Sequence, residues 1–249
     1  MDLFQAVFLG LMQGITEWLP VSSQGQTIIA GIELFGISPE KAFSYAVFLH
    51  AGTMLAALLY FRKEIKEIIL MKEKNLLQFI VIAVLSTAVT GIPMYLFLEQ
   101  ISFSSFYLSL LIGLMLLITG FLQWKKKEQK TAGETKKNAF LLGLGQGFSV
   151  LPGISRSGIT TSVLLFTGFS PEKAFKLSFL LSIPSVFLAE VLFGLKEGIQ
   201  FETNLLIAIF VAFVAGYLSI KYLIVFAKKI NFSYFCFALG IFYIVISFL

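Results

Sequence analysis

Long stretches of apolar residues, separated by short polar stretches, occupy most of the chain. The clearest are residues 76–97, 106–122, 205–226 and 232–249, which contain almost no charged side chain. A helix needs about 20 predominantly apolar residues to cross a bilayer. The pattern therefore predicts an all-α membrane protein with several spanning helices.

Composition and charge support this class and exclude others. Hydrophobic residues make up 57% of the chain and charged residues only 13%, whereas soluble domains carry about 25% charged residues. The apolar start at Leu3–Met12 lacks the basic segment and cleavage site of a signal peptide, so we expect it to remain. The single Cys236 offers neither a disulfide nor a metal cluster. The net charge of +5 comes from short loops between apolar stretches, so we expect no nucleic-acid partner.

The chain contains two copies of one unit. The phrase SPEKAF occurs at Ser38–Phe43 and again at Ser170–Phe175, and LGLMQG at Leu9–Gly14 matches LGLGQG at Leu142–Gly147. We expect each Ser-Pro-Glu to start a helix, with Ser as the N-cap, Pro in the first position and Glu in the first turn. The paired glycines four apart in the second phrase predict close packing between helices.

Each copy begins with two short apolar segments broken by Pro, Ser and Gly, which predict a re-entrant helical hairpin, and continues with three longer segments. Three crossings would turn the second copy upside down relative to the first. The prediction is an inverted repeat with six full spans. Its parts are a first repeat at 1–124 (hairpin 2–35, spans about 40–61, 76–98 and 104–124), a linker at 125–138, and a second repeat at 139–249 (hairpin 139–168, spans about 172–195, 204–227 and 232–248).

Basic residues predict the orientation. On the proposed path, Lys41 and Lys196 fall on one side. The other side collects many more: Arg62, Lys63, Lys66, Lys72, Lys74, the linker lysines, Lys173, Lys176, Lys221, Lys228 and Lys229. The positive-inside rule makes the crowded side cytoplasmic. We therefore expect a multi-pass protein of the cell (plasma) membrane, with both termini and the first hairpin opening to the outside. The basic linker would lie against anionic membrane lipids.

The two hairpin tips hold the candidate chemistry. They read QGITEWLPVSSQGQT at Gln13–Thr27 and QGFSVLPGISRSGITT at Gln146–Thr161. Glu17 and Arg156 are the charged residues nearest the tips, and a charge inside an apolar bundle is costly unless it is paired or lines a wet cavity. One interpretation is an ion pair that only holds the hairpins together. The other is an anion site, because each tip also starts a helix whose free N–H groups favour anions.

Neighbouring residue types favour an anion site. A guanidinium matches the geometry of phosphate oxygens. Hydroxyl donors are supplied by Ser22, Ser23, Ser155, Ser157 and Thr160. Glycines that allow a ligand to approach the backbone are Gly25, Gly153 and Gly158.

These tips resemble the two signatures of the integral-membrane undecaprenyl-diphosphate phosphatases of the bacitracin-resistance type. The first is [E/Q]-x-x-x-E followed by L-P-V-S-S-x-G-H, and the second is P-G-x-S-R-S-x-x-T. Here they correspond to Gln13–Glu17, Leu19–Gln26 and Pro152–Thr160. The resemblance spans essentially the whole chain. Two positions differ from the usual pattern, since the family's histidine is Gln26 here and the first acidic position is Gln13.

The resemblance implies hydrolysis of undecaprenyl (polyprenyl) diphosphate to the monophosphate carrier plus inorganic phosphate, usually with a divalent cation such as Mg²⁺ or Ca²⁺. It implies a catalytic Arg156, Ser23 as the candidate nucleophile, and Glu17 as base or metal-binding carboxylate. The implied substrate-binding residues are Gln13, Ser22, Gly25, Gln26, Gly153, Ser155, Ser157 and Thr160.

The two glutamines raise the question of a proton donor, because an amide orients a water or a phosphate but does not shuttle a proton. The only histidine is His50, in the first long apolar segment. It is either a packing residue or a substitute acid in the same cavity.

Three functions are considered. The first is a phosphatase that recycles the lipid carrier of cell-envelope or glycan synthesis. The second is a transporter or flippase of polyprenyl phosphate lipids, because inverted repeats and broken helices are transporter features. The third, a non-catalytic lipid-binding or assembly protein, explains the phosphate-type donors poorly.

Overall fold

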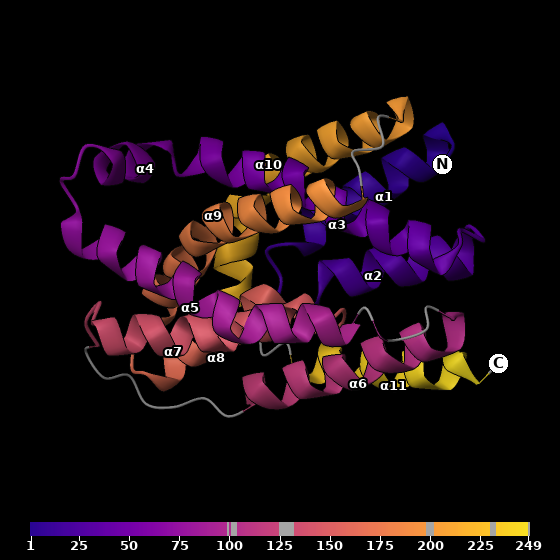
Figure 1. Cartoon of the computed structure of the whole chain (residues 1–249). Helices are drawn as coiled ribbons and strands as arrows, with labels where there is room; N and C mark the ends of the chain where they lie inside the picture. The colour runs from indigo at the N-terminus through magenta and orange to yellow at the C-terminus, as the bar shows by residue number, and fades with distance from the viewer. Residues whose placement is uncertain (99, 101–103, 125–131, 198–201, 230–232, 249) are drawn as a thin grey trace.

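The computed structural model describes residues 1–98, 100, 104–124, 132–197, 202–229 and 233–248, with the backbone alone for residues 197 and 223–229 (Figure 1). Helices account for most of this part of the chain, which contains no strand. The predicted all-α class is confirmed. The α-helices are α1 (Leu3–Thr16), α2 (Ser23–Ile29), α3 (Pro39–Tyr60), α4 (Arg62–Ile69), α5 (Lys74–Leu98), α6 (Ser105–Trp124), α7 (Lys136–Gly147), α8 (Arg156–Phe166), α9 (Pro171–Glu197), α10 (Thr203–Lys229) and α11 (Ser233–Ser247).

Parts of the predictions fall outside the described residues. These are residues 125–131 of the predicted linker, residue 232 of the last predicted span, and the side chains of Lys228 and Lys229.

Five of the described helices are long and apolar enough to cross a membrane, namely α3, α5, α6, α9 and α10. Their outer faces carry large apolar side chains such as Leu85, Leu192 and Phe210, each more than half exposed. Such faces would be costly in water, but they suit contact with lipid tails. The structure is that of a multi-pass membrane protein. The described part of helix α11 is also apolar, and its 15 residues are fewer than the about 20 that a span needs.

Two broken pairs of short helices replace full crossings. In the first, α1 ends at Thr16 and α2 begins at Ser23, and a π-helical turn at Ala30–Leu34 follows α2. In the second, α7 is followed by a 3₁₀ turn at Phe148–Val150, and α8 begins at Arg156. Figure 1 shows the α1–α2 pair extending inward from the end of the molecule that holds the labels of both termini, and the α7–α8 pair extending from the opposite side.

Each broken pair packs on a long helix of the other half of the chain, α1 on α10 and α7 on α5. A Cβ added to Gly10 or Gly14 would collide with backbone atoms of α10, and one added to Gly143 or Gly147 would collide with backbone atoms of α5. The prediction that these glycines form close-packing faces is confirmed. The helices α6 and α11 pack on each other, and α3 packs on both α9 and α10.

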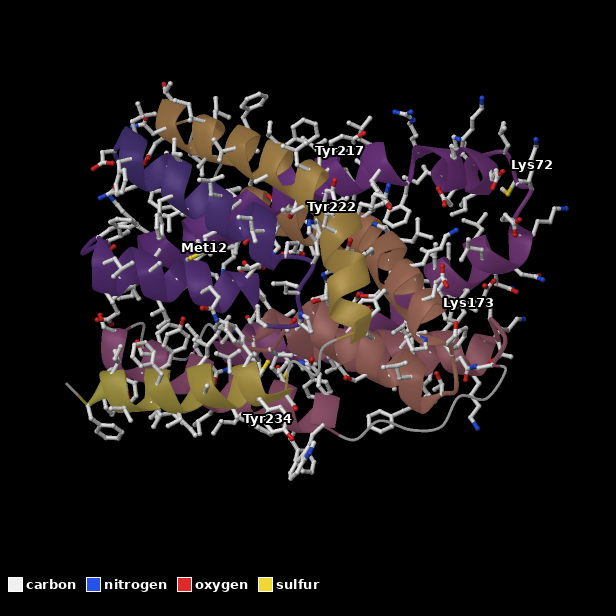
Figure 2. All side chains as sticks on the ribbon, turned by 180° about the vertical axis from the view of Figure 1, so that it is seen from behind. Met12, Lys72, Lys173, Tyr217, Tyr222 and Tyr234 are labelled. Carbon is white, nitrogen blue, oxygen red and sulfur yellow. The ribbon has the colours of Figure 1, made fainter. Side chains whose placement is uncertain are left out.

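A short amphipathic helix, α4, follows α3 and was not predicted. Its sequence RKEIKEII alternates charged and apolar residues. Near its start, Glu64 Oε1 lies 3.0 Å from Lys176 Nζ of α9, and Lys173 Nζ lies 2.8 Å from Glu134 Oε1. Figure 2 places Lys72 and Lys173, which the sequence analysis assigned to one side, toward the same end of the molecule.

The two SPEKAF phrases do start α3 and α9. The Oγ of Ser170 accepts a hydrogen bond from the Lys173 backbone N–H at 3.4 Å, as expected. Ser38 is the N-cap of α3, Pro39 opens the helix and Glu40 lies in its first turn, as predicted. The side chain of Ser38 makes no capping hydrogen bond.

Candidate active site

The first tip is a tight turn that places Glu17 beside Ser23. Glu17 follows the last residue of α1, and residues 17–20 form a turn. Ser22 has φ of 60°, a left-handed conformation that is uncommon for a residue other than glycine. Its Oγ accepts a hydrogen bond from Gly25 N at 3.3 Å, which caps α2. The turn brings Ser23 Oγ to 2.6 Å from Glu17 Oε2, to which it donates.

The second tip places Arg156 at the first position of α8. Gly153 has φ of 97°, and a Cβ there would collide with the backbone of Ile112 in α6, so only glycine fits. Ser155 Oγ accepts a hydrogen bond from Gly158 N at 3.1 Å and caps α8. The guanidinium therefore lies at the positive end of a helix.

The buried Glu17 carboxylate is the point where the two tips meet. Arg156 Nη2 donates to its Oε1 at 2.7 Å. Its Oε2 accepts from Ser23 and also from Gln13 Nε2 at 2.9 Å, and His50 Nε2 lies 3.4 Å from the same oxygen. Both oxygens of one carboxylate are thus held by groups from both tips and from α3.

Arg156 keeps donors beyond this ion pair. Its Nη1 donates to the Ser178 backbone oxygen at 3.1 Å. Its buried Nε has no hydrogen-bond partner among the described residues. Because a guanidinium carries five N–H donors, an ion pair that only joined the hairpins would leave several unused. An anion in the cavity would use them.

A polar pocket lies at this junction. Its walls combine one cation, one carboxylate, an imidazole and several hydroxyls. The lining residues are Glu17, Ser22, Ser23, Gln24, His50, Ser149, Ile154, Ser155, Arg156 and Ser157.

Several residues that the sequence suggested for substrate binding do not line the pocket. Gln13 reaches the pocket only through Glu17. Gly25 and Gly153 pack against α6 and toward each other. Thr160 Oγ1 lies 2.6 Å from Ser178 Oγ and donates to the Arg156 backbone oxygen at 2.7 Å, so it supports the helix that carries the arginine.

Gln26, the residue at the family's usual histidine position, also faces away from the pocket. Its Nε2 donates to the Val21 backbone oxygen at 3.2 Å, and its Oε1 accepts from the Tyr243 hydroxyl of α11. In the structure Gln26 therefore joins the backbone of the first tip to α11 through hydrogen bonds.

Two lining residues, Gln24 and Ser149, were missed by the sequence analysis. Neither has a hydrogen-bond partner within the part of the chain that the structure describes, so both are available to a ligand. Gln24 stands inside the first signature at its variable position, and Ser149 precedes the second signature. The signal that could have found them was their polarity beside the two helix breaks.

The pocket does not fit a metal held by the protein alone. No group of three His, Cys, Asp or Glu side chains among the described residues could hold an ion. Glu17 is the one carboxylate in the pocket wall, and both of its oxygens already accept hydrogen bonds.

Known proteins are similar to this chain over nearly its whole length. A protein of Methanothrix thermoacetophila named undecaprenyl-diphosphatase is 41% identical over 244 residues, which cover 96% of this chain and 95% of that protein. Proteins of the same name from Methanococcoides burtonii and Haloarcula marismortui are 35% and 38% identical. The alignment with the first covers 100% of both chains, and that with the second covers 94% of this chain and 93% of its relative.

The profile of the family described as "Bacitracin resistance protein BacA" matches residues 6–242, which include both tips and all of the long helices. The chain therefore belongs to the bacitracin resistance protein BacA family.

Proposed function

We propose that the protein hydrolyses undecaprenyl diphosphate to undecaprenyl phosphate and inorganic phosphate, in the recycling of a lipid carrier for cell-envelope or glycan synthesis. Its relatives carry the name of this enzyme. The observation that carries the proposal is the single cluster in which Ser23 donates to Glu17 at 2.6 Å while Arg156 pairs with the same carboxylate at 2.7 Å. A hydroxyl beside a base and a phosphate-binding cation are the parts that phosphoryl transfer needs.

In the proposed first step, Arg156 and the N-terminus of α8 hold the terminal phosphate, with Ser155 as a further donor. Ser23 Oγ attacks the terminal phosphorus and passes its proton to Glu17. The Oγ–P bond forms, the P–O bond to the bridging oxygen breaks, and undecaprenyl phosphate leaves. Glu17 suits the role of base because it already accepts the Ser23 hydrogen bond.

In the proposed second step, water attacks the phosphoserine, and inorganic phosphate leaves. The Oγ–P bond breaks as Glu17 returns its proton to Ser23 Oγ. The attacking water gives a proton to Glu17, which passes it to His50, 3.4 Å away. This proton replaces the one with which His50 protonates the departing lipid phosphate in the first step. Support comes from its ring, since Nδ1 lies 2.7 Å from the Ala46 backbone oxygen. Both ring nitrogens thus face oxygens that only accept, which the doubly protonated ring satisfies.

Replacing Ser23 with alanine is expected to lower kcat by about 10³-fold, with residual turnover from a water that Glu17 activates in place of the hydroxyl. The assay measures inorganic phosphate released from undecaprenyl diphosphate by the purified protein in detergent with Mg²⁺. Ser109→Ala is the matched control, because it removes a buried hydroxyl of α6 that has no partner among the described residues.

Full activity in Ser23→Ala would show that water, not Ser23, attacks phosphorus. A wild-type protein that releases no phosphate, but exchanges the lipid between vesicle leaflets, would replace the enzyme with a carrier. At present the carrier finds no support, since translocation does not require a hydroxyl hydrogen-bonded to a carboxylate.

Replacing His50 with asparagine is expected to lower kcat by about 10²-fold, because the amide can still bond the Ala46 carbonyl but cannot donate a proton to the leaving group. Initial rates of phosphate release by both proteins at saturating substrate provide the measurement. An unchanged kcat would make His50 a packing residue.

A divalent cation, Mg²⁺ or Ca²⁺, is proposed to reach the pocket on the diphosphate oxygens. This fits a site with one carboxylate, because such ions commonly combine one or two protein carboxylates with substrate phosphates. When bound, the cation neutralises phosphate charge. The proton transfers described above belong to residues of the chain.

We also propose that the chain is an inverted repeat with six spans, built from the two predicted units. The packing of α1 on α10 and of α7 on α5 supports it, because each hairpin contacts the corresponding long helix of the other unit. The pairing of α6 with α11 brings the two third spans together. Lys72 and Lys173 lie toward one end of the molecule (Figure 2), which supports a cytoplasmic location for that end. On this proposal the termini and the opening of the pocket lie outside.

A further inference from the structure

One helix outside both tips contacts each of them through a polar side chain. Thr119 and Gln123 lie four residues apart on α6 and so share one face. Gln123 Nε2 donates to the Pro20 backbone oxygen of the first tip at 2.9 Å. Thr119 Oγ1 accepts from the Ser155 backbone N–H of the second tip at 3.3 Å, and it lies 3.5 Å from the Gly153 backbone oxygen.

These contacts matter because the tip backbones are buried but only partly helical. A buried carbonyl without a partner is costly. In the first tip, Leu19 O accepts from Ser157 Oγ at 3.0 Å, and Pro20 O accepts from Cys236 Sγ at 3.2 Å in addition to Gln123. Side chains from other helices therefore fix the main chain just before Ser22 and Ser23.

Apolar packing adds a second link between α6 and the tips. A Cβ on Gly25 would lie 3.0 Å from Ile112 Cγ2 and 3.4 Å from Gly153 Cα. The two tips thus touch each other at their glycines, with Ile112 against both. Along one face, α6 presents Ile112, Thr119 and Gln123 to the junction.

We infer that Thr119 and Gln123 are positioning residues, which set the placement of Ser23 and Glu17 on one tip relative to Arg156 on the other. The inference rests on the proposed function, since those three residues are its reacting or binding groups. Neither Thr119 nor Gln123 lines the pocket, so each acts through the backbone of a tip. Misplacement by about 1 Å can cost about 10²-fold in rate. Losing either anchor should therefore lower kcat more than it raises KM.

The test compares Thr119→Val and Gln123→Met, which remove the polar contact at similar volume, with Thr119→Ser, which keeps the hydroxyl. We expect kcat for phosphate release from undecaprenyl diphosphate to fall about tenfold or more in the first two, with KM within about threefold of wild type. Thr119→Ser should keep wild-type kcat. The Thr119→Val, Gln123→Met double variant should be little worse than either single variant, because each already frees one tip from α6.

A second readout does not depend on activity. The chain has two tryptophans, and Trp18 lies in the first tip, 1% exposed, with Nε1 donating to Gly216 O at 3.0 Å. In a Trp124→Phe background, Trp18 is the sole tryptophan, and selective excitation of tryptophan reports on it alone. Gln123→Met should make its fluorescence clearly more sensitive to acrylamide quenching. Ser109→Ala, which removes a hydroxyl of the same helix that has no partner among the described residues, should not.

The outcomes separate the two proposals. A kcat within twofold of wild type in both Thr119→Val and Gln123→Met overturns the positioning role. So does an equal loss in Thr119→Ser or in Ser109→Ala. If Thr119→Val does not fold, Gln123→Met decides. If the wild-type protein releases no phosphate, the proposed function fails. In that case the positioning role is supported if acrylamide quenching of Trp18 increases in Gln123→Met. It is overturned if the quenching is unchanged.

Discussion

Arg156→Ala is expected to lower kcat/KM for undecaprenyl diphosphate by about 10⁴-fold, the scale of removing an arginine that stabilises phosphoryl transfer. Arg156 is the one arginine or lysine that lines the pocket, it begins α8, and its Nε has no partner among the described residues. Arg156→Lys should recover only part of the loss, because an ammonium keeps the charge but not the planar fork. Initial rates of phosphate release over a range of substrate concentrations provide the measurement.

The matched control is Arg62→Ala, since Arg62 is the other arginine of the chain and lies on α4, away from the pocket. It should keep wild-type kinetics. If Arg156→Ala retained more than about a tenth of the wild-type kcat/KM, the role of the arginine would be limited to an ion pair that joins the hairpins.

Glu17→Gln is expected to lower kcat by about 10⁴-fold, because the amide has nearly the same shape but cannot take the Ser23 proton. It should also lower the melting temperature in detergent, since it leaves the buried Arg156 charge without its partner at 2.7 Å. Phosphate release and thermal unfolding of the same preparation measure the two effects separately.

A double variant distinguishes these effects. Adding Arg156→Gln to Glu17→Gln removes the orphaned charge, so the melting temperature should rise toward that of wild type while activity stays lost. Glu190→Gln, which alters a carboxyl of α9 outside the pocket, is the control for neutralising an acid in a membrane helix. Activity that returned together with stability in the double variant would rule out Glu17 as the base.

The positions of the long helices could be predicted because lipid imposes a simple rule on sequence. Apolar stretches about 20 residues long locate α3, α5, α6, α9 and α10 to within a few residues. The short helix α4 could not be found this way, because RKEIKEII is polar and its helix depends on local periodicity and on a contact from Lys176.

The candidate site was predictable in its charged centre and less so at its edges. Glu17 and Arg156 stand out because a charge between apolar segments needs a partner. Which side chains line the cavity depends instead on the direction of each turn. The left-handed Ser22 starts α2 so that Ser23 and Gln24 face the pocket while Gln26 points to Tyr243. The spacing of residues along the sequence does not predict which side chains at the start of α2 face the pocket.

The positions of Thr119 and Gln123 show a further limit. They stand in a stretch that is otherwise apolar, SFYLSLLIGLMLLITGFLQW, where the sequence predicts only a span. Their partners are main-chain groups of Pro20 and Ser155, far away in sequence. Contacts of this kind leave no complementary side-chain pattern to detect.

The pocket is a polar cavity enclosed by helices whose outer faces are apolar. A lipid substrate can therefore place its headgroup in the pocket while its hydrocarbon tail stays among the lipid tails of the bilayer. Extracting such a tail would cost about 0.8 kcal/mol for each methylene group, which for a prenyl chain of ~55 carbons exceeds any binding energy the pocket could return. Encounter thus occurs by lateral diffusion in two dimensions, and tail length should contribute little to selectivity.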